Sequence, residues 1–329
     1  MLKGNIHRSV AVNLILIAAA CIFPVFFLGQ SYIFTVLNFI LIYVIASSGL
    51  DLMFGYSGQI SLGHAGFYAI GAYGSALLSL KLGIPGIFSM FLGAVIATVV
   101  GVVLAYPASK LKYHFLSLTT IAFGEIVYLL LVNSPGNITE GFTGLYGIPV
   151  ISLFGFRFKS SISYFYLLLF FTVLFMFVKT RIVNSKMGRA FIAIRDNTAA
   201  ANGMGINVTR YRVIAFGISA FYTAFAGALY AHFIRFISPE TFTSDACSVP
   251  LLTMVLFGGL ASQWGPVVGA VVVTLLKEVL QVTGSYQMII YSVFIVVVLL
   301  FMPKGIISFL HEFKQKHTYR KELKNRAEN

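Results

Sequence analysis

Long apolar runs separated by short polar segments recur along the sequence, and they constrain the fold more than any other feature. Many contain about 18 or more residues, enough for a helix to cross the roughly 30 Å hydrocarbon core of a membrane. The 329 residues are 58% hydrophobic and only 10% charged, whereas soluble domains carry about 25% charged residues. The alternating segments of a membrane β-barrel are absent from the sequence. The sequence therefore predicts an all-α, polytopic membrane protein.

We predict about ten transmembrane or re-entrant helices. They lie at 10–28, 32–54, 64–80, 87–108, 115–133, 162–179, 211–233, 248–262, 265–282 and 286–302. The eighth is short and interrupted by glycine, so a re-entrant segment and a total of nine spans are the alternative. The first apolar run is too long for a signal peptide and is interpreted as an uncleaved span. This organisation gives an N-terminal segment 1–9, a membrane domain 10–302 and a basic tail 303–329.

The formal net charge of +13 comes from Lys and Arg residues that cluster between the spans. The clusters are Lys3 with Arg8, Lys110 with Lys112, the basic stretch 179–212 and the tail. An excess of Lys and Arg is typical of cytoplasmic loops, so ten spans place both termini in the cytoplasm. This distribution also argues against a basic face that binds nucleic acid.

The segment 55–63 is unusual for a membrane protein because it combines glycines with polar residues: Gly55, Ser57, Gly58, Gln59, Ser61 and Gly63. Glycine is among the poorest helix formers, and an unpaired polar group in hydrocarbon costs several kcal/mol. Irregular backbone at membrane depth persists only where it is buried in protein or faces a water-filled cavity. The segment is therefore either a broken helix beside a transport path or a polar turn at the membrane interface.

A second glycine-broken stretch resembles the first and contains Gly258, Gly259, Ser262 and Gly265. Paired segments of this kind point to a transport site formed by discontinuous helices. A chance similarity between two glycine-rich segments is the alternative.

Small residues recur at helical spacing directly after the first broken segment, at Ala65, Ala69, Ala72 and Ala76. Such a seam lets helix backbones approach closely in lipid, where packing drives association. The span 64–80 is therefore predicted to be a centrally packed helix.

Glu125 lies near the middle of the predicted span 115–133, where a charged side chain costs roughly 2.5–3.5 kcal/mol. Ser117, Thr120 and Gly124 share its broad face and give this span a polar stripe. Glu125 therefore either faces a partner or a cavity, or is an interfacial residue with a structural hydrogen bond.

The histidines and cysteines do not show the spacing of a metal site. His64 and His232 are lone residues near the ends of spans, and Cys21 and Cys247 lie in or beside apolar segments. Packing roles are favoured for all of them. A phosphate-binding loop is also absent from the sequence, so we expect that the chain neither hydrolyses ATP by that route nor carries a cofactor.

Two connecting segments are longer than a simple helix connection requires. The outer one, 134–161, is rich in glycine and is either a surface loop or a docking surface or lid. The inner one, 180–210, is predicted to contain a short helix at about 189–202. One side of this helix carries Phe191, Ile194, Thr198 and Ala201.

The predicted inner helix could lie on the membrane or in the groove of a partner protein. Its apolar face is narrow and rich in alanine, which favours a protein contact. Gly203 and Gly205 end the helix before the next span.

Several motifs occur together and in order: GYSGQISLGHAGFYAIGAY, LTTIAFGEIVYLLL, GLYGIP, GRAFIAIRDNTAAANGMGINVTRYRVIAFGISAFYTAFAGALYAHF and GGLASQWGPVVGAVVVTLL. Together they closely resemble the LivM-type permeases of branched-chain amino acid ABC importers, from about residue 35 to 305. The resemblance implies that 10–302 is a permease domain in the plasma membrane of a bacterium or archaeon. It also implies a homologous LivH-type permease, two ABC ATPase subunits that bind the ATP, and an extracytoplasmic substrate-binding protein as partners.

The resemblance also assigns roles to residues. The segment 180–210 is expected to couple to the ATPase, because Ala200-Ala201-x-x-x-Gly205 matches the AA-x-x-x-G core of the importer coupling motif. Position 199 is Ala, whereas the family often has an acidic residue there. Gly188, Arg189 and Arg195 also fit the family pattern. The residues expected near the translocation pathway are Gln59, Ser61, His64 and Glu125.

Other substrates and another class of transporter are alternatives. Related ABC permeases carry urea, short amides, sugars or nucleosides. An ion-coupled secondary transporter would need several paired ionisable residues within the membrane, and Glu125 is the one good candidate in the sequence. That class would also leave the segment 188–207 without a role. A purely structural scaffold would not explain the broken segment.

Overall fold

The computed structural model describes residues 30–109, 113–134, 136, 138–153, 155–301 and 305–306. The predicted segment 1–9, the predicted first span 10–28 and all of the predicted tail 303–329 except residues 305–306 lie outside the described residues. The basic residues Lys110 and Lys112 also lie outside them.

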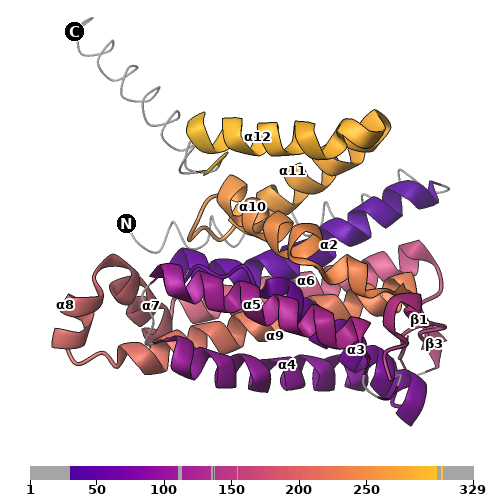
Figure 1. Ribbon diagram of the computed structural model, residues 1–329, viewed down its shortest axis with the longest axis horizontal. Helices are drawn as coiled ribbons and strands as arrows, with labels where there is room; N and C mark the ends of the chain where they lie inside the picture. Colours follow the sequence, from indigo (N-terminus) through magenta and orange to yellow (C-terminus); the bar gives the residue numbers. More distant parts are fainter. Residues whose placement is uncertain are drawn as a thin grey trace, which may run out of the picture.

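Long helices lie side by side and form the body of the molecule (Figure 1). Each predicted span from 32 onward coincides with a helix within a few residues, which confirms the helical prediction for this part of the chain. The α-helices are α2 (Ser31–Asp51), α3 (His64–Leu82), α4 (Gly86–Ala108), α5 (Tyr113–Val132), α6 (Ser161–Val183), α7 (Lys186–Asp196), α8 (Thr198–Gly203), α9 (Val208–Ile234), α10 (Val249–Gly258), α11 (Gly265–Leu280) and α12 (Gln287–Phe301).

Five helices in the described part are long and apolar enough to cross a membrane. They are α2 with the π-helical turn Leu52–Tyr56 that continues it, α4, α5 from Phe115 onward, α6 and α9. The surfaces of α4 and α5 expose large apolar side chains, as expected for helices that meet lipid or other apolar helices. The chain is therefore a multi-pass membrane protein.

Helix α9 forms the centre of the helix body and packs against α2, α3 and α4. Its contact with α3 depends on glycine: a Cβ atom on Gly71 would overlap the backbone of Ala224, and one on Gly227 would overlap the backbone of Tyr68. The predicted seam is confirmed, because Ala65, Ala69, Ala72 and Ala76 are all fully buried. Small residues thus allow α3 and α9 to pack backbone to backbone.

Helices α10 and α11 form a tight hairpin, and α12 lies beside it at the edge of the molecule (Figure 1). A Cβ on Gly258 would overlap the backbone of Gly265, and one on Gly269 would overlap the backbone of Met254. A π-helical turn, Ser244–Ser248, precedes α10. Together they give 15 residues, or about 22 Å at 1.5 Å per residue, which is shorter than the roughly 30 Å core of a bilayer.

The two ends of the long helices carry different structures (Figure 1). At one end lie α7 and α8. At the other end lie two short antiparallel ladders. In the first, β1 (Leu145–Tyr146) of the predicted outer segment 134–161 pairs with β4 (Phe236–Ile237), which follows α9. In the second, β2 (Ser152–Leu153) pairs with β3 (Phe156–Arg157), both from that segment. Short 3₁₀ turns, Gly141–Thr143 and Pro239–Phe242, flank the first ladder, and another, Gln281–Tyr286, joins α11 to α12.

The prediction of one helix at 189–202 is wrong, because the chain breaks at Asn197 into α7 and α8. Asn197 has an extended backbone, with φ of −156° and ψ of 104°. Its side-chain Oδ1 accepts a hydrogen bond from the N–H of Ala200 at 3.0 Å. Asparagine is among the best helix N-caps, so it begins a new helix where the sequence pattern suggested a continuous one.

Candidate functional site

Of the predicted broken segment 55–63, residues 55–56 belong to the π-helical turn that continues α2, and residues 57–63 form irregular backbone after it. Gly58 has a positive φ of +73°, which glycine adopts without strain. The N–H of Gly58 bonds to the carbonyl of Phe54 at 3.0 Å, and the N–H of Gln59 bonds to that of Met53 at 3.2 Å. The helix thus ends in a closed turn that leads into the irregular segment.

Helix α5 supplies partners for the backbone of this segment. The N–H of Leu62 donates to Thr120 Oγ1 at 3.1 Å, and Ser117 Oγ donates to the carbonyl of Ile60 at 3.3 Å. A Cβ on Gly63 would overlap the backbone of Thr120, so glycine is required for this approach. The polar stripe predicted on this span therefore serves in part to satisfy irregular backbone that is buried within the protein.

The side chains of Gln59, Ser61 and His64 are 3%, 1% and 1% exposed. Gln59 Nε2 donates to Ser57 Oγ at 2.8 Å and to the carbonyl of Arg212 in α9 at 3.2 Å. His64 Nδ1 lies 3.1 Å from Ser61 Oγ, and its Nε2 lies 2.7 Å from a hydroxyl of α9, Ser219 Oγ. These predicted site residues form one buried polar group that joins the broken segment to α9.

Glu125 is placed differently from the other predicted pathway residues. Its side chain is exposed on α5, next to the exposed apolar side chains of Ile126 and Leu129, whereas Thr120 and Gly124 of the same helix are buried. A carboxylate on an apolar surface is costly in lipid. This face of α5 is therefore suited to a protein partner or to water.

The predicted coupling segment is held in shape by side-chain caps. Ser185 Oγ accepts the N–H of Met187 at the start of α7, and Asn207 Oδ1 accepts the N–H of Arg210 at the start of α9. Sequence reasoning did not single out these caps or Asn197. A polar residue just before each short helix is the signal that could have found them.

The predicted coupling residues take up two kinds of position. Gly188 is buried at the corner between α6 and α7, where a Cβ would overlap the backbone of Val183, and Ala201 is buried as well. Arg189, Ala200 and Gly205 are exposed, whereas Arg195 is 37% exposed and its Nη1 donates inward to the carbonyl of Gly55. The exposed set can meet a partner, whereas the buried pair shapes the segment.

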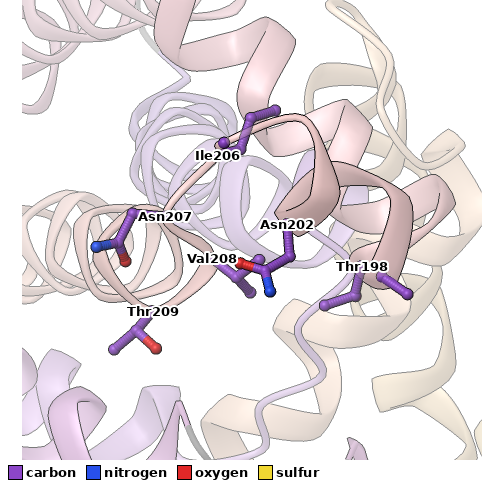
Figure 2. Close-up of a pocket in the computed structure, with 8 residues that line it drawn as sticks. Thr198, Asn202, Ile206, Asn207, Val208 and Thr209 are labelled. Atoms are coloured by element: carbon purple, nitrogen blue, oxygen red, sulfur yellow. The ribbon is translucent and has the colours of Figure 1, made fainter.

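An open hollow of about 710 Å³ lies between α8 and the start of α9 (Figure 2). The close-up shows both polar side chains, such as Asn202 and Asn207, and apolar ones, Ile206 and Val208, around it. Its lining residues are Thr198, Ala199, Asn202, Gly205, Ile206, Asn207, Val208 and Thr209. The hollow and the exposed residues of α8 form one continuous surface at this end of the molecule.

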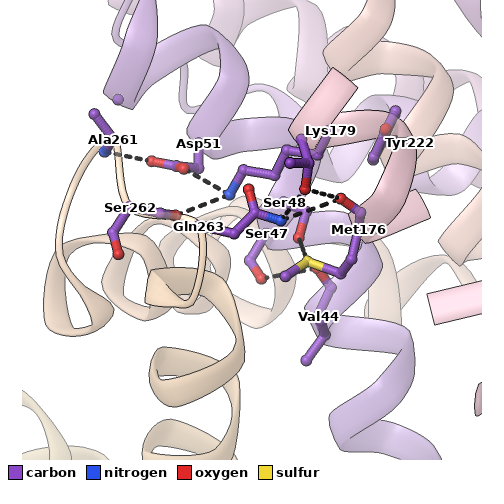
Figure 3. A network of polar contacts seen from close by, with 12 residues as sticks. Val44, Ser47, Ser48, Asp51, Met176, Lys179, Tyr222, Ala261, Ser262 and Gln263 are labelled. Carbon is purple, nitrogen blue, oxygen red and sulfur yellow. Dashed lines mark hydrogen bonds and ion pairs between the residues drawn. The ribbon is translucent and has the colours of Figure 1, made fainter. Parts of the chain in front are cut away.

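A fully buried ion pair joins α2 to α6 (Figure 3). Asp51 Oδ2 lies 2.8 Å from Lys179 Nζ, and both side chains are 0% exposed. Asp51 Oδ1 also accepts the N–H of Ala261 at 2.8 Å, and Lys179 Nζ donates to the carbonyl of Ser262 at 3.0 Å. Both charges thus also bind the turn between α10 and α11.

The expectation that Glu125 is the one good intramembrane ionisable residue is therefore wrong. Asp51 lies within the predicted span 32–54, and Lys179 is the last residue of the predicted span 162–179. Their positions within predicted spans could thus have identified both residues as candidate intramembrane charges. A charge near the end of a span is usually placed at the interface, however, and the sequence does not show that these two charges meet.

The described residues do not contain a group of three or more His, Cys, Asp or Glu side chains that could hold a metal ion. His64 and His232 instead bond to protein groups: His232 Nε2 lies 2.8 Å from Ser75 Oγ, and its Nδ1 lies 2.8 Å from the carbonyl of Pro149.

Known proteins resemble this chain over most of its length. The family described as "Branched-chain amino acid transport system / permease component" matches residues 32–303. The permease protein LivM of the high-affinity branched-chain amino acid transport system of Salmonella typhimurium is 33% identical over 290 residues, which cover 81% of this chain and 68% of that protein. The LivM protein of Escherichia coli K12 is 32% identical with the same coverage.

More distant relatives include both kinds of permease. A probable LivM of Methanocaldococcus jannaschii is 25% identical, over 81% of this chain and 90% of that protein. The LivH permease of Escherichia coli K12 is 24% identical, over 81% of this chain and 91% of that protein. No solved structure matches the chain significantly. The multi-pass helical body and the match over residues 32–303 together show that the chain belongs to the family of branched-chain amino acid transport system permease components.

Proposed function

We propose that the chain is one of two permease subunits of an ATP-driven ABC importer for branched-chain, hydrophobic amino acids. The family match and the LivM relatives support this role. The subunit would lie in the plasma membrane of a bacterium or archaeon and form half of the translocation pathway by alternating access. The other half would come from a LivH-type permease, since LivH proteins are themselves relatives of this chain.

Two ABC ATPase subunits would bind and hydrolyse the ATP, and this chain would carry no cofactor. The surface formed by α8 and its hollow is the observation that carries the coupling role. The surface is exposed, Asn197 caps α8 and Asn207 caps α9, and α8 is connected to α9 by a short loop and to α6 through α7. A short, rigid projection of this kind fits a cleft in a partner protein.

The basic stretch 179–212 favours a cytoplasmic position for this projection, and the strand-bearing end would then face outward. The outward segment 145–158 would receive an extracytoplasmic substrate-binding protein. In this orientation α10 and α11 form a re-entrant hairpin that enters from the outer side, because α10 is too short to cross the bilayer.

The translocation path would run along the exposed face of α5, between the two permeases. Glu125 lies on that face, and the neighbouring broken segment is held to α9 by the buried side chains of Gln59 and His64, with Ser61 bonded to His64. An interface between two permeases removes Glu125 from lipid and gives it access to water and to the ammonium group of an amino acid.

Replacing Glu125 with leucine tests this assignment. We expect leucine uptake to fall about 10- to 100-fold, the equivalent of the roughly 1.5–3 kcal/mol of a hydrogen bond to a charged group. The chain itself should fold normally because the side chain is exposed in this chain, and co-purification of the companion permease checks assembly. Leu129→Ala, an exposed apolar residue one turn away, is the control and should transport normally. Normal uptake by Glu125→Leu would show that Glu125 faces lipid or a structural contact instead.

The proposed function is tested by reconstituting the chain with its companion permease and ATPases in liposomes, with the binding protein outside. We expect uptake of labelled leucine that requires ATP. Urea, short amides and sugars serve as competitors, and uptake of one of these in place of leucine would overturn the substrate assignment. Transport by this chain alone, without ATP, would overturn the ABC role and favour an ion-coupled transporter.

Replacing Ala200 with tryptophan tests the coupling surface, and Leu153→Trp is the matched control. Ala200 is exposed, so Ala200→Trp should fold normally but prevent the ATPase from co-purifying. Leu153→Trp places the same side chain on an exposed residue at the opposite end and should leave the complex intact.

A further inference from the structure

The two glycine-broken segments meet inside the protein. A Cβ on Gly55 would lie only 2.5 Å from the backbone nitrogen of Ala261, so the peptide at Gly55 packs directly against the turn between α10 and α11. That turn has unusual backbone: Gly259 has a φ of 104° and Ala261 a φ of 53°. A left-handed non-glycine residue persists only where its surroundings fix it.

The turn is fixed by directed bonds from α2 and α6, which we call the clamp: the ion pair of Asp51 and Lys179 with its bonds to Ala261 and Ser262 (Figure 3). Gln263 adds to the contact with α6, where its Nε2 donates to Thr180 Oγ1 at 2.6 Å. The tip of the hairpin is therefore bonded to both helices.

The other end of α10 is held by the same stretch of chain. The N–H of Ala65, just after the first broken segment, donates to Ser248 Oγ at 2.8 Å at the start of α10. The stretch 51–65 thus contacts both the start of α10 and the turn that follows its end.

The coupling segment is bonded to this assembly through Arg195 of α7. Its Nη1 donates to the carbonyl of Gly55 at 2.8 Å. The absence of a side chain at Gly58 allows the close approach of α7, because a Cβ there would lie 3.0 Å from Arg195 Cγ. The peptide at Gly55 therefore contacts the hairpin turn and the ATPase-facing segment at once.

A fully buried ion pair adds little net stability compared with apolar side chains of similar size. The bonds of the pair are short and have fixed directions, so they resist sliding of α2, α6 and the hairpin turn past one another. Rigid contacts of this kind transmit a displacement from one element to another.

We propose that Asp51, Lys179 and Arg195 are positioning residues that make α7, the turn after α2 and the α10–α11 hairpin move as one unit. A movement of α7 on ATP binding is passed through Arg195 to Gly55 and through the clamp to the hairpin. The movement of the hairpin, and not only that of the long helices, then switches the translocation path between its inward-open and outward-open states. The transport consequence rests on the proposed function, whereas the rigid connection is a property of this chain.

The test compares the assembled wild-type transporter with Asp51→Asn/Lys179→Met and with Arg195→Met in proteoliposomes. The double variant leaves no unpaired charge and retains an oxygen that can accept the N–H of Ala261. We expect the number of substrate molecules transported per ATP to fall about tenfold, as for a lost coupling of typical size. ATP hydrolysis by the assembled complex should change less than about twofold. A merely structural defect would lower transport and hydrolysis together and leave their ratio unchanged.

Arg195→Lys retains a charged donor, so we expect it to transport more substrate molecules per ATP than Arg195→Met does. An unchanged ratio in both Asp51→Asn/Lys179→Met and Arg195→Met, with normal wild-type transport, would overturn the inference.

A second measurement does not depend on transport. Spin labels at Lys186→Cys in α7 and Leu260→Cys in the hairpin turn, both exposed positions, report the distance across the unit in the purified chain, with Cys21 and Cys247 replaced by serine. We expect one narrow distance in the wild type and a broad distribution in Arg195→Met and in the double variant. Equally narrow distributions would overturn the rigid connection. If the wild type fails to take up leucine but the variants still give broader distance distributions than the wild type, only the proposed function is overturned.

Discussion

Replacing Lys179 with methionine should lower the free energy of unfolding by about 3–5 kcal/mol. Lys179 and Asp51 are both fully buried, and Lys179 provides the positive charge 2.8 Å from the carboxylate. Methionine fills a similar volume, so the cost comes mainly from the uncompensated carboxylate and not from a cavity. Equilibrium unfolding in mixed detergent micelles measures this loss.

The double variant Asp51→Asn/Lys179→Met separates charge from packing. It removes both charges and should recover most of the lost stability, because a neutral pair avoids the desolvation of a lone ion. A Lys179→Met variant as stable as the wild type would contradict the assignment of a dry, paired site. The assignment would also be contradicted if the double variant lost as much stability as Lys179→Met alone.

Replacing Gly71 with alanine should destabilise the packing of α3 on α9 by about 1–3 kcal/mol or more. The added Cβ would overlap the carbonyl group and Cα of Ala224. These are backbone atoms, so no side chain can rotate away, and the two helices must separate. Thermal unfolding in detergent, followed by the loss of monodisperse protein, measures the effect.

Gly74 of the same helix gives a matched control. A Cβ there would lie 3.5 Å from Gly93 Cα, which is ordinary van der Waals contact. Gly74→Ala should therefore be neutral or slightly stabilising, because alanine favours helix by about 1 kcal/mol over glycine. Equal destabilisation by Gly71→Ala and Gly74→Ala would mean that helix propensity or general crowding, and not the α3–α9 contact, governs the response.

The helices of the described part could be predicted closely because hydrocarbon leaves the backbone few choices. An apolar run must satisfy its own N–H and C=O groups, and a helix does this within the segment. The alanine seam of α3 was predictable for a related reason, since small residues at helical spacing allow close packing. The break at Asn197 was not predicted, because the cap competed with an otherwise continuous helical pattern.

The candidate site was predictable only in part. The sequence marked Ser117 and Thr120 as polar, but the bonds they make to the backbone of Ile60 and Leu62 depend on where α5 packs. Arg195 was expected to face the ATPase from the family resemblance. Its guanidinium instead reaches inward to Gly55, although the side chain is partly exposed.

The sequence by itself determined that this chain is a helical membrane protein, where its apolar segments begin and end, and which family it resembles. These properties follow from local composition and motif, because the solvent around each segment decides its backbone structure. Only the tertiary structure decided that Asp51 meets Lys179 and that two glycine-broken segments lie against each other. A buried charge is tolerated only beside its partner, and helix packing, which no local pattern specifies, decides which partner it meets.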